Sequence, residues 1–289
     1  MSETAEYYVW QGYELLTRGE ALQAELLYRQ ALQIEPGNVD AMTGVMQCLY
    51  IQGKYRELVD WSKRVLSSPV RNIAFTHEIL GAACMEIGRY RQAADHFQQA
   101  MALNPASLSA VQGYVRCLRQ SRSRERLKTL LPEYVARFPD DPFLLHEYGM
   151  LLASMGDYTR ALEMLQRAAS LDPSFYNWHA LSWVLGKLKR WAEAKEALFR
   201  AIDAGAPDEA IATLYCDIGI YELYAGNLSS AETFLWKASE SFPSRSVYFK
   251  AYRALLLTYW RQRRMRQLLG TYWKLLREIL RRKRPYRDM

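Results

Sequence analysis

The chain has 289 residues, half of them hydrophobic, and a formal net charge of +7. The positive charge is confined to one end, because residues 245–289 carry 14 Lys or Arg against 2 Asp or Glu, whereas the preceding part has an acidic excess of 5. The longest strongly apolar stretch, near Ala254 to Trp260, is far shorter than the roughly 20 residues of a membrane-spanning helix, which argues against a membrane-embedded protein.

A proline recurs along the chain at a nearly fixed interval. Five prolines close the same local pattern, and the three in the middle of the chain are equally spaced: Pro36, Pro105, Pro139, Pro173 and Pro243. Four of these prolines follow a pair of residues one helical turn apart, an alanine and then a large side chain. The pairs are Ala24 and Tyr28, Ala93 and Phe97, Ala161 and Leu165, and Ala231 and Leu235. A period of about 34 residues predicts a stack of supersecondary units rather than one globular core.

Small residues recur inside each unit at positions where two helices would have to approach closely. Gly81 precedes Ala93, and Gly12, Gly149 and Gly219 precede the alanines of their own units at the same spacing. A second glycine, such as Gly88, follows the first predicted helix, where a left-handed C-cap favours this residue.

These units resemble tetratricopeptide repeats, helical hairpins of about 34 residues with the pattern W-x2-L-G-x2-Y…A-x3-F…P. The third unit is the clearest, with Leu80-Gly81, Gly88-Arg89-Tyr90, Ala93, Phe97 and Pro105. The resemblance implies an all-α, right-handed α-solenoid superhelix of about eight helical hairpins. We expect seven repeats at 5–38, 39–73, 74–107, 108–141, 142–174, 175–211 and 212–248, a degenerate capping repeat at 249–282 and a basic tail at 283–289.

The sequence contains no motif of catalysis or nucleotide binding. Walker A, dinucleotide-binding, metalloprotease and nucleophile-elbow patterns are all missing from it. We therefore expect no enzymatic activity, no cofactor, no metal site and no small-molecule substrate. His146 and His179 fall at the same position of consecutive units, where they could make ordinary hydrogen bonds, form a pH-sensitive pair or contact an anion.

The cysteines also follow the period of the repeats. Cys48, Cys84 and Cys117 lie at nearly the same place in successive first helices, which predicts small buried packing residues rather than disulfides or metal ligands. Reduced cysteines, together with an N-terminus that lacks the features of a signal peptide, favour a cytoplasmic protein.

The resemblance also implies a binding groove on the concave face, lined by set positions of each first helix. Projected onto this sequence, these positions give a largely apolar and aromatic surface: Val9, Tyr13, Tyr50, Met85, Arg116, Phe143, His146, Met150, Tyr176, His179, Trp183, Ile220, Tyr224 and Trp260. Exposed apolar patches commonly mark binding sites. Two alternatives remain open: a phase error of one residue would place some of these side chains in the core, and a tight superhelix or a neighbouring subunit could fill the groove.

The groove positions favour one kind of client. Relatives that hold the C-terminal carboxylate of chaperones use Lys and Asn at two set positions of one repeat, and no unit here has that combination. We therefore expect a protein client that presents an amphipathic helix or an extended apolar segment.

The basic end suggests a second contact. Its residues are Arg261, Arg263, Arg264, Arg266, Lys274, Arg277, Arg281, Arg282, Lys283 and Arg284, with Trp260, Tyr272 and Trp273 among them. A solvated helical face would also explain this composition. Of the functional interpretations we favour an acidic protein surface, with RNA or an anionic membrane surface as the alternative. The sequence thus predicts a non-catalytic interaction scaffold, adaptor or chaperone-like protein.

Overall fold

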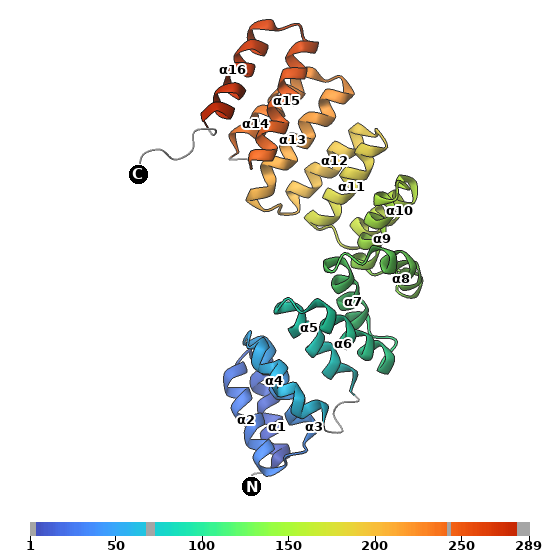
Figure 1. The fold of residues 1–289 in the computed structure, drawn as a ribbon, viewed down its shortest axis with the longest axis vertical. Helices are drawn as coiled ribbons and strands as arrows, with labels where there is room; N and C mark the ends of the chain where they lie inside the picture. Colours follow the sequence, from blue (N-terminus) through green and yellow to red (C-terminus); the bar gives the residue numbers. More distant parts are fainter. Residues whose placement is uncertain (1–3, 68–72, 242–243, 282–289) are drawn as a thin grey trace. The chain divides into compact units, whose positions relative to one another are not determined.

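The computed structural model describes residues 4–67, 73–241 and 244–281, and in this part of the chain all regular structure is helical (Figure 1). The chain divides into two compact units, Met1–Phe138 and Pro139–Met289. The first unit contains α1 (Ala5–Thr17), α2 (Ala21–Ile34), α3 (Val39–Ile51), α4 (Tyr55–Leu66), α5 (Ala74–Glu86), α6 (Tyr90–Leu103), α7 (Leu108–Gln120) and α8 (Arg124–Arg137).

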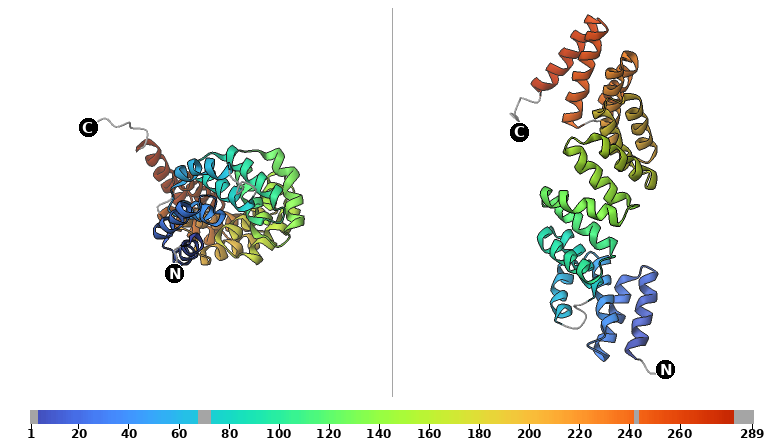
Figure 2. Two further views of the ribbon diagram at one scale, coloured as in Figure 1. Left: turned by 90° about the horizontal axis from the view of Figure 1, so that it is seen from below. Right: turned by 90° about the vertical axis from the view of Figure 1, so that its right-hand side faces the viewer.

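The second unit contains α9 (Pro142–Ser154), α10 (Tyr158–Leu171), α11 (Phe175–Lys187), α12 (Trp191–Asp203), α13 (Asp208–Ala225), α14 (Leu228–Glu240), α15 (Arg245–Arg261) and α16 (Met265–Arg281). Each odd-numbered helix packs antiparallel against the even-numbered helix that follows it (Figure 2). The predicted all-α solenoid of helical hairpins is therefore confirmed, whereas the repeat boundaries and the handedness of the superhelix stay predictions.

Within each unit, consecutive hairpins also stack on one another. Odd-numbered helices contact each other along the array, as α1 does with α3, α3 with α5 and α5 with α7 in the first unit, and α9 with α11 and α13 with α15 in the second. In each unit, we call the surface that its odd-numbered helices present the odd-helix face of that unit. None of the helices in the described residues is long and apolar enough to span a bilayer.

The core is built from the recurrent small residues. Ala24, Ala93, Ala161 and Ala231 are fully buried. A methyl group placed at Gly81 would lie 2.9 Å from the ring of Phe97, and one placed at Gly113 would lie closer still. Phe97 therefore fills a gap between α5 and α7 that exists only because both facing residues lack a side chain. The predicted burial of Cys48, Cys84 and Cys117 is confirmed, since all three thiols are free and buried.

The turn inside each hairpin keeps one backbone geometry even where glycine is missing. Gly19, Gly53, Gly88, Gly156 and Gly226 have positive φ angles, and three residues of other types adopt the same region: Arg122 (φ 55°), Lys189 (φ 59°) and Arg263 (φ 58°). This conformation costs residues with a Cβ atom roughly 1–2 kcal/mol. The fourth, sixth and eighth hairpins therefore keep this turn against residue preference, with the helix-closing backbone hydrogen bond that the glycine turns also have, such as Ser123 N–H to the carbonyl oxygen of Leu118.

Candidate functional site

All fourteen predicted groove residues lie on odd-numbered helices, and the structure buries none of them. Four of the aromatic side chains are well exposed, with relative accessibilities of 62% for Tyr13, 71% for Tyr176, 54% for Tyr224 and 64% for Trp260. The helical period of each first helix therefore separated surface from core positions in this set.

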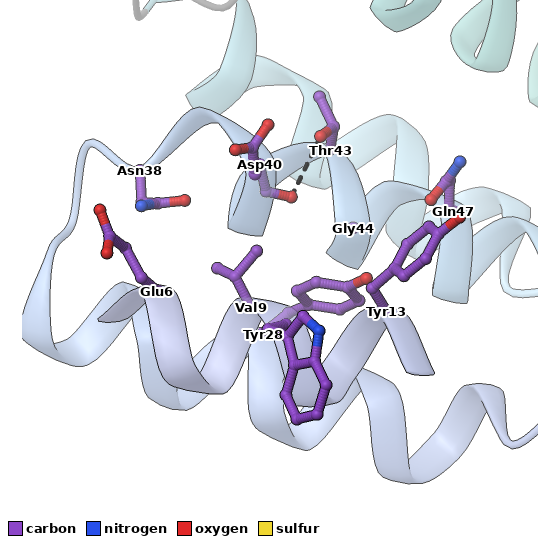
Figure 3. Close-up of a pocket in the computed structure, with 10 residues that line it drawn as sticks. Glu6, Val9, Tyr13, Tyr28, Asn38, Asp40, Thr43, Gly44 and Gln47 are labelled. Carbon is purple, nitrogen blue, oxygen red and sulfur yellow. Dashed lines mark hydrogen bonds between the residues drawn. The ribbon is translucent and has the colours of Figure 1, made fainter. Parts of the chain in front are cut away.

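The first unit has two pockets on its odd-helix face. One lies between α1, α2 and α3 and includes Val9 and Tyr13 among its lining residues (Figure 3). The other has a volume of about 300 Å³ and includes Tyr50, Met85 and Arg116. The five predicted residues of this unit thus line concave parts of the surface.

In the second unit a groove runs between α13 and α15. Its apolar lining includes Ile220, Tyr224 and Leu257, and two cations, Lys250 and Arg253, lie among these side chains. The Lys250 ammonium is 2.5 Å from the carboxylate of Asp217. Burial opposes the charge of Lys250, but Asp217 outweighs this effect and raises the pKa of the amine.

Two exposed aromatic side chains of the second unit are held from behind by other rings. Tyr224 stacks on Trp191, with ring centroids 5.2 Å apart. Trp183 meets the ring of Tyr158 edge to face at 6.4 Å, and the Lys187 ammonium lies 5.2 Å from the centroid of the Trp183 ring. These contacts fix the orientation of side chains that still present one surface to solvent.

His146 and His179 have separate partners. The Nδ1 atom of His146 is 2.8 Å from Oδ1 of Asn177, and the ring of His179 stacks on Phe175 at 5.6 Å. Burial lowers the pKa of His179, which favours the neutral ring. His146 thus makes an ordinary hydrogen bond, one of the possibilities that the sequence left open, whereas His179 makes a ring stack.

A different histidine pair was missed by the sequence reasoning. His77 on α5 and His96 on α6 approach with their Nδ1 atoms 3.2 Å apart, and burial together with His77 lowers the pKa of His96. The spacing of residues within the repeat could have predicted this contact, because it places the beginning of the first helix of a hairpin beside the middle of the second helix. Among the described residues, no group of three or more His, Cys, Asp or Glu is arranged to hold a metal ion.

Several residues of the predicted basic end take part in the fold. Arg261 donates to the carbonyl oxygen of Leu223 at 3.0 Å, Arg264 pairs with Glu232 at 2.5 Å, and Lys274 lies over the ring of Trp236. Arg263 occupies the left-handed turn between α15 and α16. These four residues are therefore not simply a free cationic surface.

The remaining predicted basic residues divide into two groups. Arg266 and Arg277 are exposed on α16. Four others fall beyond what the structure describes: the side chain of Arg281, and Arg282, Lys283 and Arg284.

Family comparisons agree with this architecture. Two family models described as tetratricopeptide repeat match residues 74–107 and 152–215. The chain is a tetratricopeptide repeat protein. A solved tetratricopeptide repeat protein from Parabacteroides merdae ATCC 43184 covers 88% of this chain and 98% of its own, with a TM-score of 0.59 and 17% sequence identity, a likeness that supports the fold alone.

Curated relatives of this tetratricopeptide repeat protein match only over part of their length. The Vi polysaccharide export protein VexE of Salmonella typhi is 30% identical over 113 residues, which are 38% of this chain and 17% of the relative. Anaphase-promoting complex subunit 7 of Mus musculus is 25% identical over 175 residues, which are 60% of this chain and 30% of the relative. The chain thus spans less than a third of either protein.

Proposed function

We propose that this tetratricopeptide repeat protein is a non-catalytic interaction scaffold or adaptor that binds an apolar or amphipathic segment of a client protein on its odd-helix face. The observation that carries the proposal is that the odd-numbered helices of each unit expose aromatic side chains, Tyr13 in the first unit and Tyr176 and Tyr224 in the second. Large exposed aromatic surfaces on a folded domain are commonly interaction sites. The anaphase-promoting complex subunit among the relatives is, by its name, part of an assembly, which is consistent with this role.

The aromatic side chains of the second unit are suited to act as anchors. Trp183 and Tyr224 are already packed against Tyr158 and Trp191, so little rotamer freedom remains to be lost on binding. Trp and Tyr are also the residue types that dominate interface energetics. We therefore assign the main apolar contact with the client to these two residues.

The test of this function is the double substitution of Trp183→Ala and Tyr224→Ala. Short amphipathic peptides, selected against the unmodified protein from a phage-displayed library, serve as probes. We expect the double variant to bind them about 1,000-fold more weakly, since each anchor contributes roughly 2 kcal/mol and about 1.4 kcal/mol is a factor of ten. Leu171→Ala, which removes an exposed apolar side chain from α10, is the matched control and should leave the affinity unchanged. Undiminished binding by the double variant would refute the assignment.

We propose the C-terminal helix as the second contact, with an acidic protein surface as its partner. On α16 the exposed side chains of Met265, Leu269 and Tyr272 follow one helical stripe, and Arg266 and Arg277 border it. An anionic membrane surface or RNA is the alternative partner for the same combination of apolar and cationic groups.

The double substitution of Arg266→Glu and Arg277→Glu separates these partners. Binding to phosphatidylserine vesicles and to a fluorescent single-stranded RNA is measured by co-sedimentation and polarisation at low and high salt. We expect that the unmodified protein binds neither vesicles nor RNA in a salt-sensitive way. We also expect that it binds a polyglutamate-leucine peptide and that the variant loses affinity for this peptide. Salt-sensitive binding of vesicles or RNA that the variant loses would instead establish the alternative.

We also propose that the protein acts in the cytoplasm. The support is that its four cysteines are free and buried, as in proteins of reducing compartments. Burial raises the pKa of Cys48 and Cys216 to about 12, so these thiols are poor nucleophiles, which is consistent with a structural rather than catalytic use.

A further inference from the structure

The pocket between α1, α2 and α3 has an unusual floor. Tyr28 projects from α2 into the gap between α1 and α3, and the glycines that face it there are Gly12 and Gly44. A methyl group at Gly44 would lie 2.5 Å from the Cζ atom of the Tyr28 ring, and one at Gly12 would lie 3.0 Å from it. Because Cζ carries the hydroxyl group, this group lies at the level of the gap, where the ring contributes to the pocket (Figure 3).

The Tyr28 hydroxyl belongs to a buried side chain but has no hydrogen-bond partner among the residues that the structure describes. The residue is only 3% exposed. Burial raises its pKa to about 12, and Cys48, Tyr13 and Asp40 act in the same direction, so the hydroxyl is neutral at physiological pH. The hydroxyl oxygen itself is not sealed off from the pocket, so a ligand there can donate a hydrogen bond to it.

An internal comparison shows that the fold does not require this hydroxyl. Phe97 occupies the equivalent place two hairpins later, wedged between Gly81 and Gly113, and it also lines a pocket on the odd-helix face. The packing role of the ring is therefore met by phenylalanine. The oxygen atom of Tyr28 is an addition specific to the first pocket.

The walls of the first pocket are acidic and aromatic. The carboxylates of Glu6 and Asp40 line it and make no ion pair among the described residues. Trp10 and Tyr13, which are 57% and 62% exposed, supply ring faces beside them. Carboxylates, an acceptor hydroxyl and open ring faces together are the groups that recognise a cation attached to an aliphatic stem.

We propose that this pocket binds a lysine or arginine side chain of a client segment, an inference that rests on the proposed use of the odd-helix face for client binding. The cationic group donates to the Tyr28 hydroxyl, and its stem lies along Trp10 and Tyr13. Asp40 and Glu6 supply negative charge on the pocket wall, with Glu6 at the end away from the hydroxyl (Figure 3). The net charge of +7 comes from residues 245–289, whereas residues 1–40 carry two Arg and seven Asp or Glu, so the sequence that forms this pocket is acidic. The first unit thus selects a basic residue, in contrast to the cationic groove between α13 and α15.

The test uses fluorescein-labelled peptides of sequence Ala-Leu-X-Leu-Ala, in which X is Arg, Lys or Gln, with fluorescence polarisation as the readout. We expect the Arg or Lys peptide to bind more tightly than the Gln peptide. This preference should fall by about tenfold in Asp40→Asn, because that variant loses a charged partner of the cation. It should fall by a smaller factor in Tyr28→Phe, because that variant loses a neutral hydrogen-bond acceptor. Glu20→Gln, an equal loss of charge at an exposed site of the same unit, should keep the preference.

Tyr28→Phe is a safe variant for this purpose, because Phe97 already fills the equivalent gap. Its urea midpoint should match that of the unmodified protein. Cationic peptides that bind no more tightly than the Gln peptide, or a preference that persists in both Asp40→Asn and Tyr28→Phe, would overturn the inference. The variant lacking Trp183 and Tyr224 should retain the preference, since the first unit is unchanged in it, so the two proposals can fail separately.

Discussion

Replacing Gly113 by alanine is expected to destabilise the first unit, although alanine is the better helix former. The added methyl group would meet the ring of Phe97 well inside van der Waals contact, and Gly81 closes the other side of the same ring at a projected 2.9 Å. The ring therefore has no direction in which to move. Overpacking of this kind costs about 1–3 kcal/mol, which exceeds the gain of about 1 kcal/mol in helix propensity.

The matched control is Gly37→Ala in the same unit. Gly37 lies in the turn between α2 and α3, has no positive φ angle and has no atom within 4 Å of a projected methyl group. This substitution should leave stability unchanged or raise it by about 0.4–1 kcal/mol, because alanine restricts the unfolded chain. Urea unfolding followed by circular dichroism measures both variants. A midpoint for Gly113→Ala at or above that of Gly37→Ala would show that the helices can separate to admit the methyl group.

Much of the fold follows from the sequence because each repeat obeys the same local chemistry. The small residues and the regular spacing of the prolines predicted a stack of helical hairpins, which the structure confirms, whereas the boundaries of the repeats stay predictions. The backbone at Arg122, Lys189 and Arg263 was harder to foresee, since these residue types disfavour a positive φ angle. Backbone hydrogen bonds that close the first helix hold them in this conformation: the N–H of Ser123 donates to the carbonyl oxygen of Leu118 at 2.9 Å, as the N–H of Arg89 does to Cys84 after Gly88.

The surface was predicted less completely than the fold. A helical period places Tyr13 or Trp183 on a face, but it does not give the partners of a side chain that bends toward a neighbouring helix. This is why the contact between His77 and His96 was missed, and why Arg264 and Lys274 were assigned to a binding surface although they contact Glu232 and Trp236. The pocket above Tyr28 likewise depends on two glycines from different hairpins.

The second large effect is expected at Glu222, a carboxylate on α13 that is only 4% exposed. Lys195 on α12 lies 2.7 Å from its Oε1 atom, and the side-chain amide of Asn227 donates to its Oε2 atom at 2.6 Å. Burial opposes the charged form, but these partners outweigh it and lower the pKa of Glu222. The carboxylate therefore contributes stability above its unfolded pKa of about 4.3, and this contribution is lost as pH falls through the lower folded pKa.

Lys195→Met should remove the cation while keeping the aliphatic stem, which leaves a buried carboxylate with too few partners. Breaking a fully buried pair costs about 3–5 kcal/mol; since the Lys195 side chain is 34% exposed, we expect about 2 kcal/mol at pH 7. Without Lys195, burial raises the pKa of Glu222 and the variant takes up a proton at higher pH. The loss should therefore shrink as pH falls from the raised pKa of Glu222 in the variant to its lowered pKa in the unmodified protein, below which the carboxyl group is neutral in both folded proteins.

Urea unfolding at pH 7 and at pH 4 tests this expectation, with Arg190→Met as the control. Arg190 pairs with Glu193 on the surface of the same unit, and both side chains are largely exposed, so little change should follow at either pH. An equal loss for Lys195→Met at both pH values would contradict this expectation, because a loss that arises from the charge of Glu222 must depend on pH. A loss confined to neutral pH would assign its role to the charge, and would make Glu222 the electrostatic link between α12, α13 and the turn before α14.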